Sequence, residues 1–227
     1  MVFRPAFARF MLLVLTLSAL VTGCVGAPEP VRRPVRTSTA WTPPASPDGR
    51  MCLANLSRSY ANFTPLPDQY YGAGCSAVGA VRLASLRSDD GLLQLSNLGP
   101  VTCPLASTLS GWARFGVDRA ARSILGSPLV RIETMGSYSC RNVAGTSRLS
   151  AHASANAVDV SGFVLADGRR ITVLRDWDNE SPQIRAFLAT IRMSACKRFG
   201  TVLSPEYNPA HRDHFHLEVG NTRPFCR

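Results

Sequence analysis

Two segments of this chain contain all four of its histidines. The first, residues 150–159, carries His152 and Asp159, and the second, residues 211–216, carries the other three histidines. Neutral imidazole is the commonest metal ligand in proteins, and a combined set of histidine and carboxylate ligands is typical of zinc. So few histidines, gathered so locally, predict a metal site.

Strand spacing indicates which of these side chains can meet. The run that begins at His214 (His-Phe-His-Leu-Glu-Val) is typical of a strand, in which His214 and His216 point to one face. His152 and Asp159 are an odd number of positions apart, so they can converge only if the chain turns between them, and the small residues 153–156 allow that turn. We therefore expect His152 on a loop, Asp159 on one strand and His216 on another. Three protein ligands leave a fourth position for water, as in catalytic zinc sites.

The elements that must position these residues are predicted from hydrophobic periodicity and from turn and cap residues. The predicted strands are Ala80–Leu83, Leu92–Leu95, Leu129–Met135, Val158–Leu165 and Ile171–Leu174. One helix is predicted over Cys103–Leu125, and a second runs to Cys196 from Ser181 as N-cap and Pro182 at its first position.

Several short motifs match the pattern of one protein family. In chain order they are Ser137–Arg141, Leu149–Ala153, Asn156–Asp159, Asp176–Trp177, Phe187–Leu188, Thr201–Asn208 and His211–His216. With these motifs, the chain from Cys52 to Cys226 resembles the bacterial extensin-like C-terminal domain family. It also resembles the related zinc D-Ala-D-Ala carboxypeptidases and murein endopeptidases of the LAS type.

The resemblance implies a fold and an activity. The expected fold is α+β, a small antiparallel sheet with flanking helices, stabilised by disulfides and similar to the D-Ala-D-Ala carboxypeptidases and the hedgehog domain. The resemblance implies that the protein hydrolyses peptidoglycan stem or cross-link peptides. It would do so with one zinc ion per chain, bound by His152, Asp159 and His216. The hedgehog domain binds zinc in a signalling role that is not hydrolysis. The alternative interpretation is therefore a non-catalytic protein that binds peptidoglycan in the same cleft.

The resemblance also implies catalytic residues. His214 and His211 match the endopeptidase pattern His-x-x-His-x-His, whereas Asp213 matches the acidic position of the carboxypeptidase pattern Glu-x-x-His. We favour the two histidines as the groups beside the water and keep Asp213 open as the base. Arg141 resembles the arginine that orients the substrate in these peptidases, and a cation there could stabilise the developing oxyanion.

The loop that carries His152 has two further features. Ser150 and Asn156 flank it, and we expect both to support it through hydrogen bonds. Ala155 stands where the peptidase pattern has glycine. If that position requires a positive φ, alanine costs about 1 kcal/mol there.

The cysteines predict a disulfide framework. Apart from Cys24 they are Cys52, Cys75, Cys103, Cys140, Cys196 and Cys226. An even number in an exported chain is typical of disulfides, and the absence of any Cys-x-x-Cys pair argues against a cysteine metal site. Modest loop lengths favour Cys52 with Cys75 and Cys196 with Cys226, which leaves Cys103 with Cys140.

The first 50 residues are typical of an exported lipoprotein. Residues 1–23 combine basic residues with an apolar run too short to span a bilayer, and they end in a lipobox-like sequence before Cys24. We expect a periplasmic protein anchored to a membrane through a lipidated Cys24. The outer membrane is favoured over the inner one because Val25 is not the aspartate that retains lipoproteins at the inner membrane. Residues 24–50 are predicted to be a disordered tether and residues 51–227 the domain.

The net charge of +10 is carried almost wholly by arginine. Such a charge often indicates nucleic acid, but predicted export and the absence of helix-turn-helix or zinc-finger spacing argue against that partner. The expected partners are peptidoglycan and, through the anchor, a membrane, and the expected state is a monomer. The chain has no Gly-x-Ser-x-Gly sequence, which argues against a serine hydrolase.

Overall fold

The computed structural model of the protein describes residues 46–220 and 223–227. The predicted signal segment, the lipidation site Cys24 and most of the predicted tether lie outside the described residues. Helix α1 (Pro47–Arg58) begins within the range predicted as tether, so folded structure starts before residue 51. The Ser46 hydroxyl caps this helix by accepting a hydrogen bond of 3.1 Å from the Gly49 amide, and Pro47 occupies the first turn. Among the described residues, no helix is long and apolar enough to cross a membrane.

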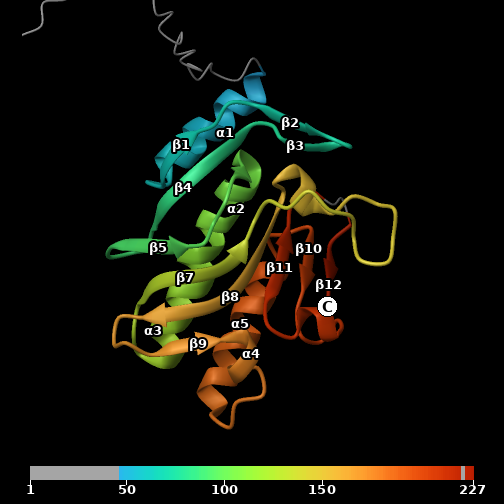
Figure 1. Cartoon of the computed structure of the whole chain (residues 1–227). Coiled ribbons are helices and arrows are strands. Elements are labelled where there is room, and N and C mark those ends of the chain that lie inside the picture. The colour runs from blue at the N-terminus through green and yellow to red at the C-terminus, as the bar shows by residue number, and fades with distance from the viewer. Residues whose placement is uncertain (1–45, 221–222) are drawn as a thin grey trace, which may run out of the picture. The chain divides into compact units, whose positions relative to one another are not determined.

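The strands of the described residues form one large mixed sheet and one small hairpin (Figure 1). The strands are β1 (Asn62–Pro65), β2 (Gln69–Gly72), β3 (Cys75–Ala77), β4 (Ala80–Arg87), β5 (Leu92–Ser96), β6 (Val101–Thr102), β7 (Leu129–Gly136), β8 (Ala157–Leu165), β9 (Arg170–Thr172), β10 (Thr201–Leu203), β11 (Phe215–Glu218) and β12 (Phe225–Cys226). The main path of the ten-stranded sheet is β1-β4-β5-β7-β8-β11-β10-β12, with β6 on β4 and β9 on β8, while β2 and β3 pair only with each other.

The prediction of a small antiparallel sheet is wrong in two respects: the sheet has ten strands, and it is mixed. Most neighbours are antiparallel, but β5 pairs with β7, and β10 with β12, in parallel. A parallel pair needs a crossover connection. The helical run between β6 and β7 provides that crossover, because it carries the chain back across the sheet after β5. The α+β class itself is confirmed.

The two predicted helices are present and cover one face of the sheet, whereas residues 173 and 174, predicted as the end of a strand, lie in a helix. The predicted helix over 103–125 is α2 (Cys103–Trp112), a π-helical turn η1 (Ala113–Asp118) and α3 (Arg119–Leu125) in direct succession. The second predicted helix is α5 (Pro182–Cys196), capped by Ser181, and it follows the short α4 (Val173–Asp176). Figure 1 shows α2, α3 and α5 behind the strands.

A single large core fills the space between these helices and the sheet. It includes Trp112, Phe163, Phe187 and Phe215, all fully buried. The indole N–H of Trp112 donates a hydrogen bond of 2.9 Å to the Ile191 carbonyl, so the one polar group of this large side chain is satisfied. The core packs against one face of β8 and β11, which leaves their other face available for polar side chains.

Three disulfides join Cys52 to Cys103, Cys75 to Cys140 and Cys196 to Cys226. The predicted Cys196–Cys226 pair is confirmed, but the pairs Cys52–Cys75 and Cys103–Cys140 are wrong. The physical reason is helix packing: α1 lies against α2, which places Cys52 beside the first residue of α2. Cys75 begins β3 and meets Cys140 in the segment after β7. Loop length alone does not predict these disulfide partners.

Candidate metal centre

His152 lies on η2 (Ala151–Ser154), a single 3-10 turn that begins at Ser150. The Ser150 hydroxyl accepts a hydrogen bond of 3.4 Å from the His152 amide, and the turn ends at Ala155 with φ of 55°. This is the left-handed conformation in which alanine costs about 1 kcal/mol. The chain therefore has the positive φ for which glycine is the preferred residue, and it reaches that conformation with a fully buried alanine.

Asp159 and His216 are direct neighbours across two strands. They lie on β8 and β11, which are antiparallel, and the register places His216 opposite Asp159. Phe215 and Leu217 belong to the core. Because side chains alternate along a strand, His216 and Glu218 face away from the helices, on the side of the sheet where η2 brings His152.

The donor atoms of His152, Asp159 and His216 form a close triangle. His152 Nε2 lies 3.1 Å from His216 Nδ1 and 3.2 Å from Asp159 Oδ1, and His216 Nδ1 lies 3.0 Å from the same oxygen. Four ligands bonded to zinc at about 2.0–2.1 Å in a tetrahedron lie roughly 3.3 Å apart. The triangle thus has nearly the size that a shared zinc ion requires. Among the described residues, these three form the group of donors that could hold a metal ion.

The other nitrogen of each imidazole fixes where the ring proton lies. His152 Nδ1 is 2.8 Å from the Ser137 carbonyl oxygen, which can only accept, so the proton is on Nδ1 and the lone pair is on Nε2. His216 Nε2 is 3.5 Å from a carboxylate oxygen of Glu218, which favours a proton there and a lone pair on Nδ1. Two nitrogen lone pairs and a carboxylate therefore converge, an arrangement that attracts a cation.

The electrostatics of this group also favour positive charge between the donors. Burial alone would raise the pKa of Asp159, but its close contacts with the rings of His152 and His216 outweigh burial and hold that pKa well below its usual range. Burial opposes the charged form of His216, yet Asp159 and Glu218 outweigh that effect and raise the pKa of His216 to about 9. In the absence of a metal, a proton on His216 supplies the positive charge that the donors attract.

The remaining histidines lie next to this triangle. His214 is buried, with Nε2 3.6 Å from Asp159 Oδ1 and Nδ1 2.7 Å from Asp213 Oδ1. Asp213 therefore contacts the centre through His214 rather than directly. His211 Nδ1 lies 2.7 Å from Asn208 Oδ1, and its ring centre is 5.2 Å from that of His214. Burial and the two neighbouring histidines lower the pKa of His211 to about 4, so its ring is neutral at pH 7.

Arg141 lies away from the place that its expected role requires, whereas the Asn156 side chain supports the His152 loop as expected. Arg141 is exposed, and its side chain contacts none of the described donors; its carbonyl oxygen accepts a hydrogen bond of 3.0 Å from the Ser150 amide. The Asn156 side chain accepts from Thr102 Oγ1 at 2.9 Å and donates to the Val219 carbonyl at 2.7 Å. Asn156 thus connects the end of β11 to the start of α2 and supports the loop from its strand end.

Sequence reasoning missed Glu218 and Ser137 as partners of the two imidazoles. A signal for Glu218 was present, because it follows His216 by two positions and so lies on the same face of the strand. Ser137 acts through its backbone carbonyl, which no residue type reveals. Both groups orient an imidazole ring, as carboxylates and carbonyls commonly do behind metal-bound histidines.

Comparison with known proteins gives one match. A family model described as "Extensin-like protein C-terminus" matches residues 50–227. No curated protein and no solved structure shows a significant match. The matched range contains His152, Asp159 and His216 together with all three disulfides.

Proposed function

This chain belongs to the extensin-like protein C-terminus family, and we propose that its folded domain is a zinc-dependent peptidase that hydrolyses peptidoglycan stem or cross-link peptides. Its fold would then be a variant of the D-Ala-D-Ala carboxypeptidase type. The protein would act in the periplasm, anchored to a membrane, with the outer membrane favoured, through a lipidated Cys24.

The observation that carries this proposal is the convergence of three acceptors. His152 Nε2, His216 Nδ1 and the Asp159 carboxylate meet within 3.2 Å of one another, and each ring directs its other nitrogen outward, to the Ser137 carbonyl or the Glu218 carboxylate. Without a metal, the proton on His216 provides the positive charge among these groups. With a metal, the set matches the composition of catalytic zinc sites, which have three protein ligands and an open position.

The roles of the chain's own residues follow from their contacts. His152, Asp159 and His216 would hold the ion, which when bound supplies a polarised water and a Lewis acid for the peptide carbonyl. His214 would move the proton at Nε2, because Asp213 accepts from Nδ1 and so orients the ring toward the centre. This arrangement supports His214 as the base and Asp213 as the group that positions it.

His211 would act on the same side of the centre as His214. Its ring lies 6.1 Å from that of His216 and packs against Tyr207, with ring centres 5.4 Å apart. A neutral His211 whose Nδ1 donates to Asn208 presents a lone pair at Nε2, so it would accept a hydrogen bond from the substrate or water rather than provide a positive charge.

One observation favours the non-catalytic alternative, a peptidoglycan-binding protein of the cell envelope. The predicted oxyanion cation, Arg141, lies exposed and without contact to the centre, so the zinc ion alone would have to stabilise the developing charge. The three disulfides agree with an oxidising compartment for both functions. Hydrolysis remains our proposal because the His214–Asp213 pair has no evident purpose in simple binding.

Isolated sacculi provide the direct test. The protein with zinc should release soluble muropeptides, detected by chromatography, and a chelator should stop the release. His214→Ala should lower the rate by about 10²–10⁴-fold while zinc stays bound, and Asp213→Asn should lower it less. Co-sedimentation with sacculi without any new muropeptide would favour the binding protein instead. Full activity in His214→Ala would contradict the assigned base.

A further inference from the structure

A cavity of about 310 Å³ lies beside the metal centre. Three segments that are distant in sequence form its walls: Gly74 at the tip of the β2–β3 hairpin, residues of the stretch 148–156 around η2, and residues 218–220 at the end of β11. This volume is at the small end of the range of ligand sites, roughly 300–1,000 Å³. It suits one amino-acid residue better than a sugar chain.

The cavity and the metal centre share structure. Glu218 lines the cavity and also contacts His216 Nε2 at 3.5 Å. Ala151 and Ala153, which line the cavity as well, flank His152 in η2. A molecule in the cavity would therefore lie one side chain away from the donor triangle.

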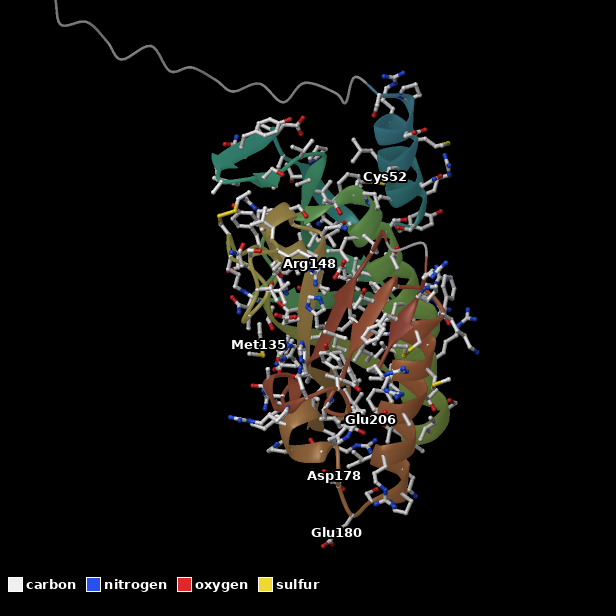
Figure 2. All side chains as sticks on the ribbon, turned by 90° about the vertical axis from the view of Figure 1, so that its right-hand side faces the viewer. Cys52, Met135, Arg148, Asp178, Glu180 and Glu206 are labelled. Carbon is white, nitrogen blue, oxygen red and sulfur yellow. A yellow bond between two sulfur atoms is a disulfide. The ribbon has the colours of Figure 1, made fainter. Side chains whose placement is uncertain are left out.

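The charged residues of the lining are Arg148 and Glu218. Arg148, labelled in Figure 2, lies in the loop that leads into η2. Its backbone is held in place, since its amide donates to Thr146 Oγ1 at 3.2 Å and its carbonyl accepts from the Val143 amide at 2.8 Å. Within residues 46–220 and 223–227, no acceptor or carboxylate partners the Arg148 guanidinium. By contrast, Arg192 pairs with Glu206 elsewhere on the domain.

The cavity walls are held together covalently and by close packing. The Cys75–Cys140 disulfide joins the β2–β3 hairpin to the segment that precedes the Arg148 loop. At the hairpin tip, Gly74 has φ of +82°, a conformation that favours glycine, and a Cβ atom there would lie 2.7 Å from Leu149 Cδ1 and displace the end of that side chain. The walls are thus positioned before a ligand arrives, which reduces the entropic cost of binding.

We propose that this cavity binds an amino-acid group whose ammonium and carboxylate are both free, with the carboxylate on Arg148 and the ammonium on Glu218. An anion alone would be repelled by Glu218, and a cation alone by Arg148, whereas a group that carries both charges satisfies both. The guanidinium is suited to a carboxylate because it can donate two parallel hydrogen bonds. The inference rests on the proposed function, for which it names the part of a wall peptide held beside the zinc: a side chain that ends in an amino-acid group, since a peptide terminus has only one of the two groups free.

The test compares three small probes that share the D-alanine core and differ in which of the two charges they carry. D-Alanine carries both charges, N-acetyl-D-alanine lacks the ammonium, and D-alaninamide lacks the carboxylate. Calorimetric titration into the protein, with and without zinc, should show D-alanine bound at least about tenfold more tightly than either blocked form. Arg148→Ala should lose about tenfold in D-alanine affinity. Arg141→Ala, an exposed arginine near the same loop but outside the cavity lining, should change it less than about twofold.

Several results would overturn this inference: no D-alanine binding by the wild-type protein, equal binding of the three probes, or equal effects of the two arginine variants. The zinc content of Arg148→Ala should match that of the wild type, which separates loss of the cavity from damage to the centre. Binding to the zinc-free protein is measured without any hydrolysis. Failure of the peptidase proposal and failure of the cavity proposal therefore give different results.

Discussion

His152 Nε2 and His216 Nδ1 lie 3.1 Å apart although 64 positions separate the two residues in the chain. Each ring directs its other nitrogen to an acceptor, the Ser137 carbonyl for His152 and the Glu218 carboxylate for His216. Two lone pairs at this distance repel each other unless a cation lies between them. The surrounding hydrogen bonds hold both rings in the orientation that a metal ion would need.

Glu218 should strengthen metal binding without touching the metal. Replacing a carboxylate that orients a ligand histidine typically costs 10–100-fold in metal affinity. We expect Glu218→Ala to weaken zinc binding by about that factor, and Glu218→Gln by less because its amide oxygen can still accept from His216. Competition with a chromophoric chelator measures the affinity. Glu206→Ala, which removes a surface carboxylate paired with Arg192, is the control and should leave the affinity unchanged. An unaltered affinity in Glu218→Ala would contradict the role given to this contact.

The Cys75–Cys140 disulfide should hold the β2–β3 hairpin in place. This hairpin forms its own two-stranded sheet, and isolated pairs of strands are marginally stable in water. Replacing both cysteines by alanine should lower the free energy of unfolding by about 2–4 kcal/mol, as measured by denaturant titration. Amides of residues 69–77 should lose protection from hydrogen exchange before the core does. If that segment kept its protection in the double variant, the disulfide would not be what anchors it.

Asp89 should make stability depend on pH. Hydrogen bonds from Arg119 and Arg114, 2.9 and 2.7 Å long, lower the pKa of Asp89 to about 2. A carboxylate with a lowered folded-state pKa stabilises the fold above its unfolded value of 3.8, and that contribution is lost as the pH falls toward 2. Asp89→Asn should therefore be less stable than the wild type at pH 7, and the difference should shrink between pH 4 and pH 2. Thermal unfolding across this range measures it.

The matched control for Asp89 is Asp178→Asn. Asp178 is exposed, and no ion pair involves it among the described residues. Its replacement should change the unfolding temperature little at either end of the pH range. A stability difference for Asp89→Asn that stayed constant from pH 7 to pH 2 would show that the ion pairs of Asp89 do not contribute through its charge.

Much of the site could be predicted because it depends on local periodicity. The two-residue spacing of His214 and His216 predicted one face of a strand, and in the structure His216 lies on β11 while His214 directly precedes its first residue, Phe215. The odd separation of His152 from Asp159 requires a turn, which the structure forms as η2 with Ala155 at positive φ. The start of α5 at Ser181 and Pro182 follows in the same way from cap chemistry.

The parts that could not be predicted depend on contacts between distant elements. The partners of Cys52 and Cys75 follow from the packing of α1 on α2 and from the place of the β2–β3 hairpin, neither of which loop lengths encode. The parallel pairing of β5 with β7 depends on the path of a helical crossover. The exposed position of Arg141 likewise could not be derived from its motif, because a motif gives the neighbours of a residue in sequence and not the direction of its side chain.

Zinc stoichiometry tests the central claim most directly. The purified, oxidised protein should bind about one zinc ion per chain, measured by elemental analysis after dialysis. Asp159→Ala, checked by circular dichroism to be folded, should bind almost none, while Asp213→Asn should retain the ion because, within the described residues, the Asp213 side chain contacts His214 and none of the three donors. A folded wild-type protein without zinc affinity, or an Asp159→Ala variant that still binds one equivalent, would contradict the assignment of His152, Asp159 and His216 as a metal centre.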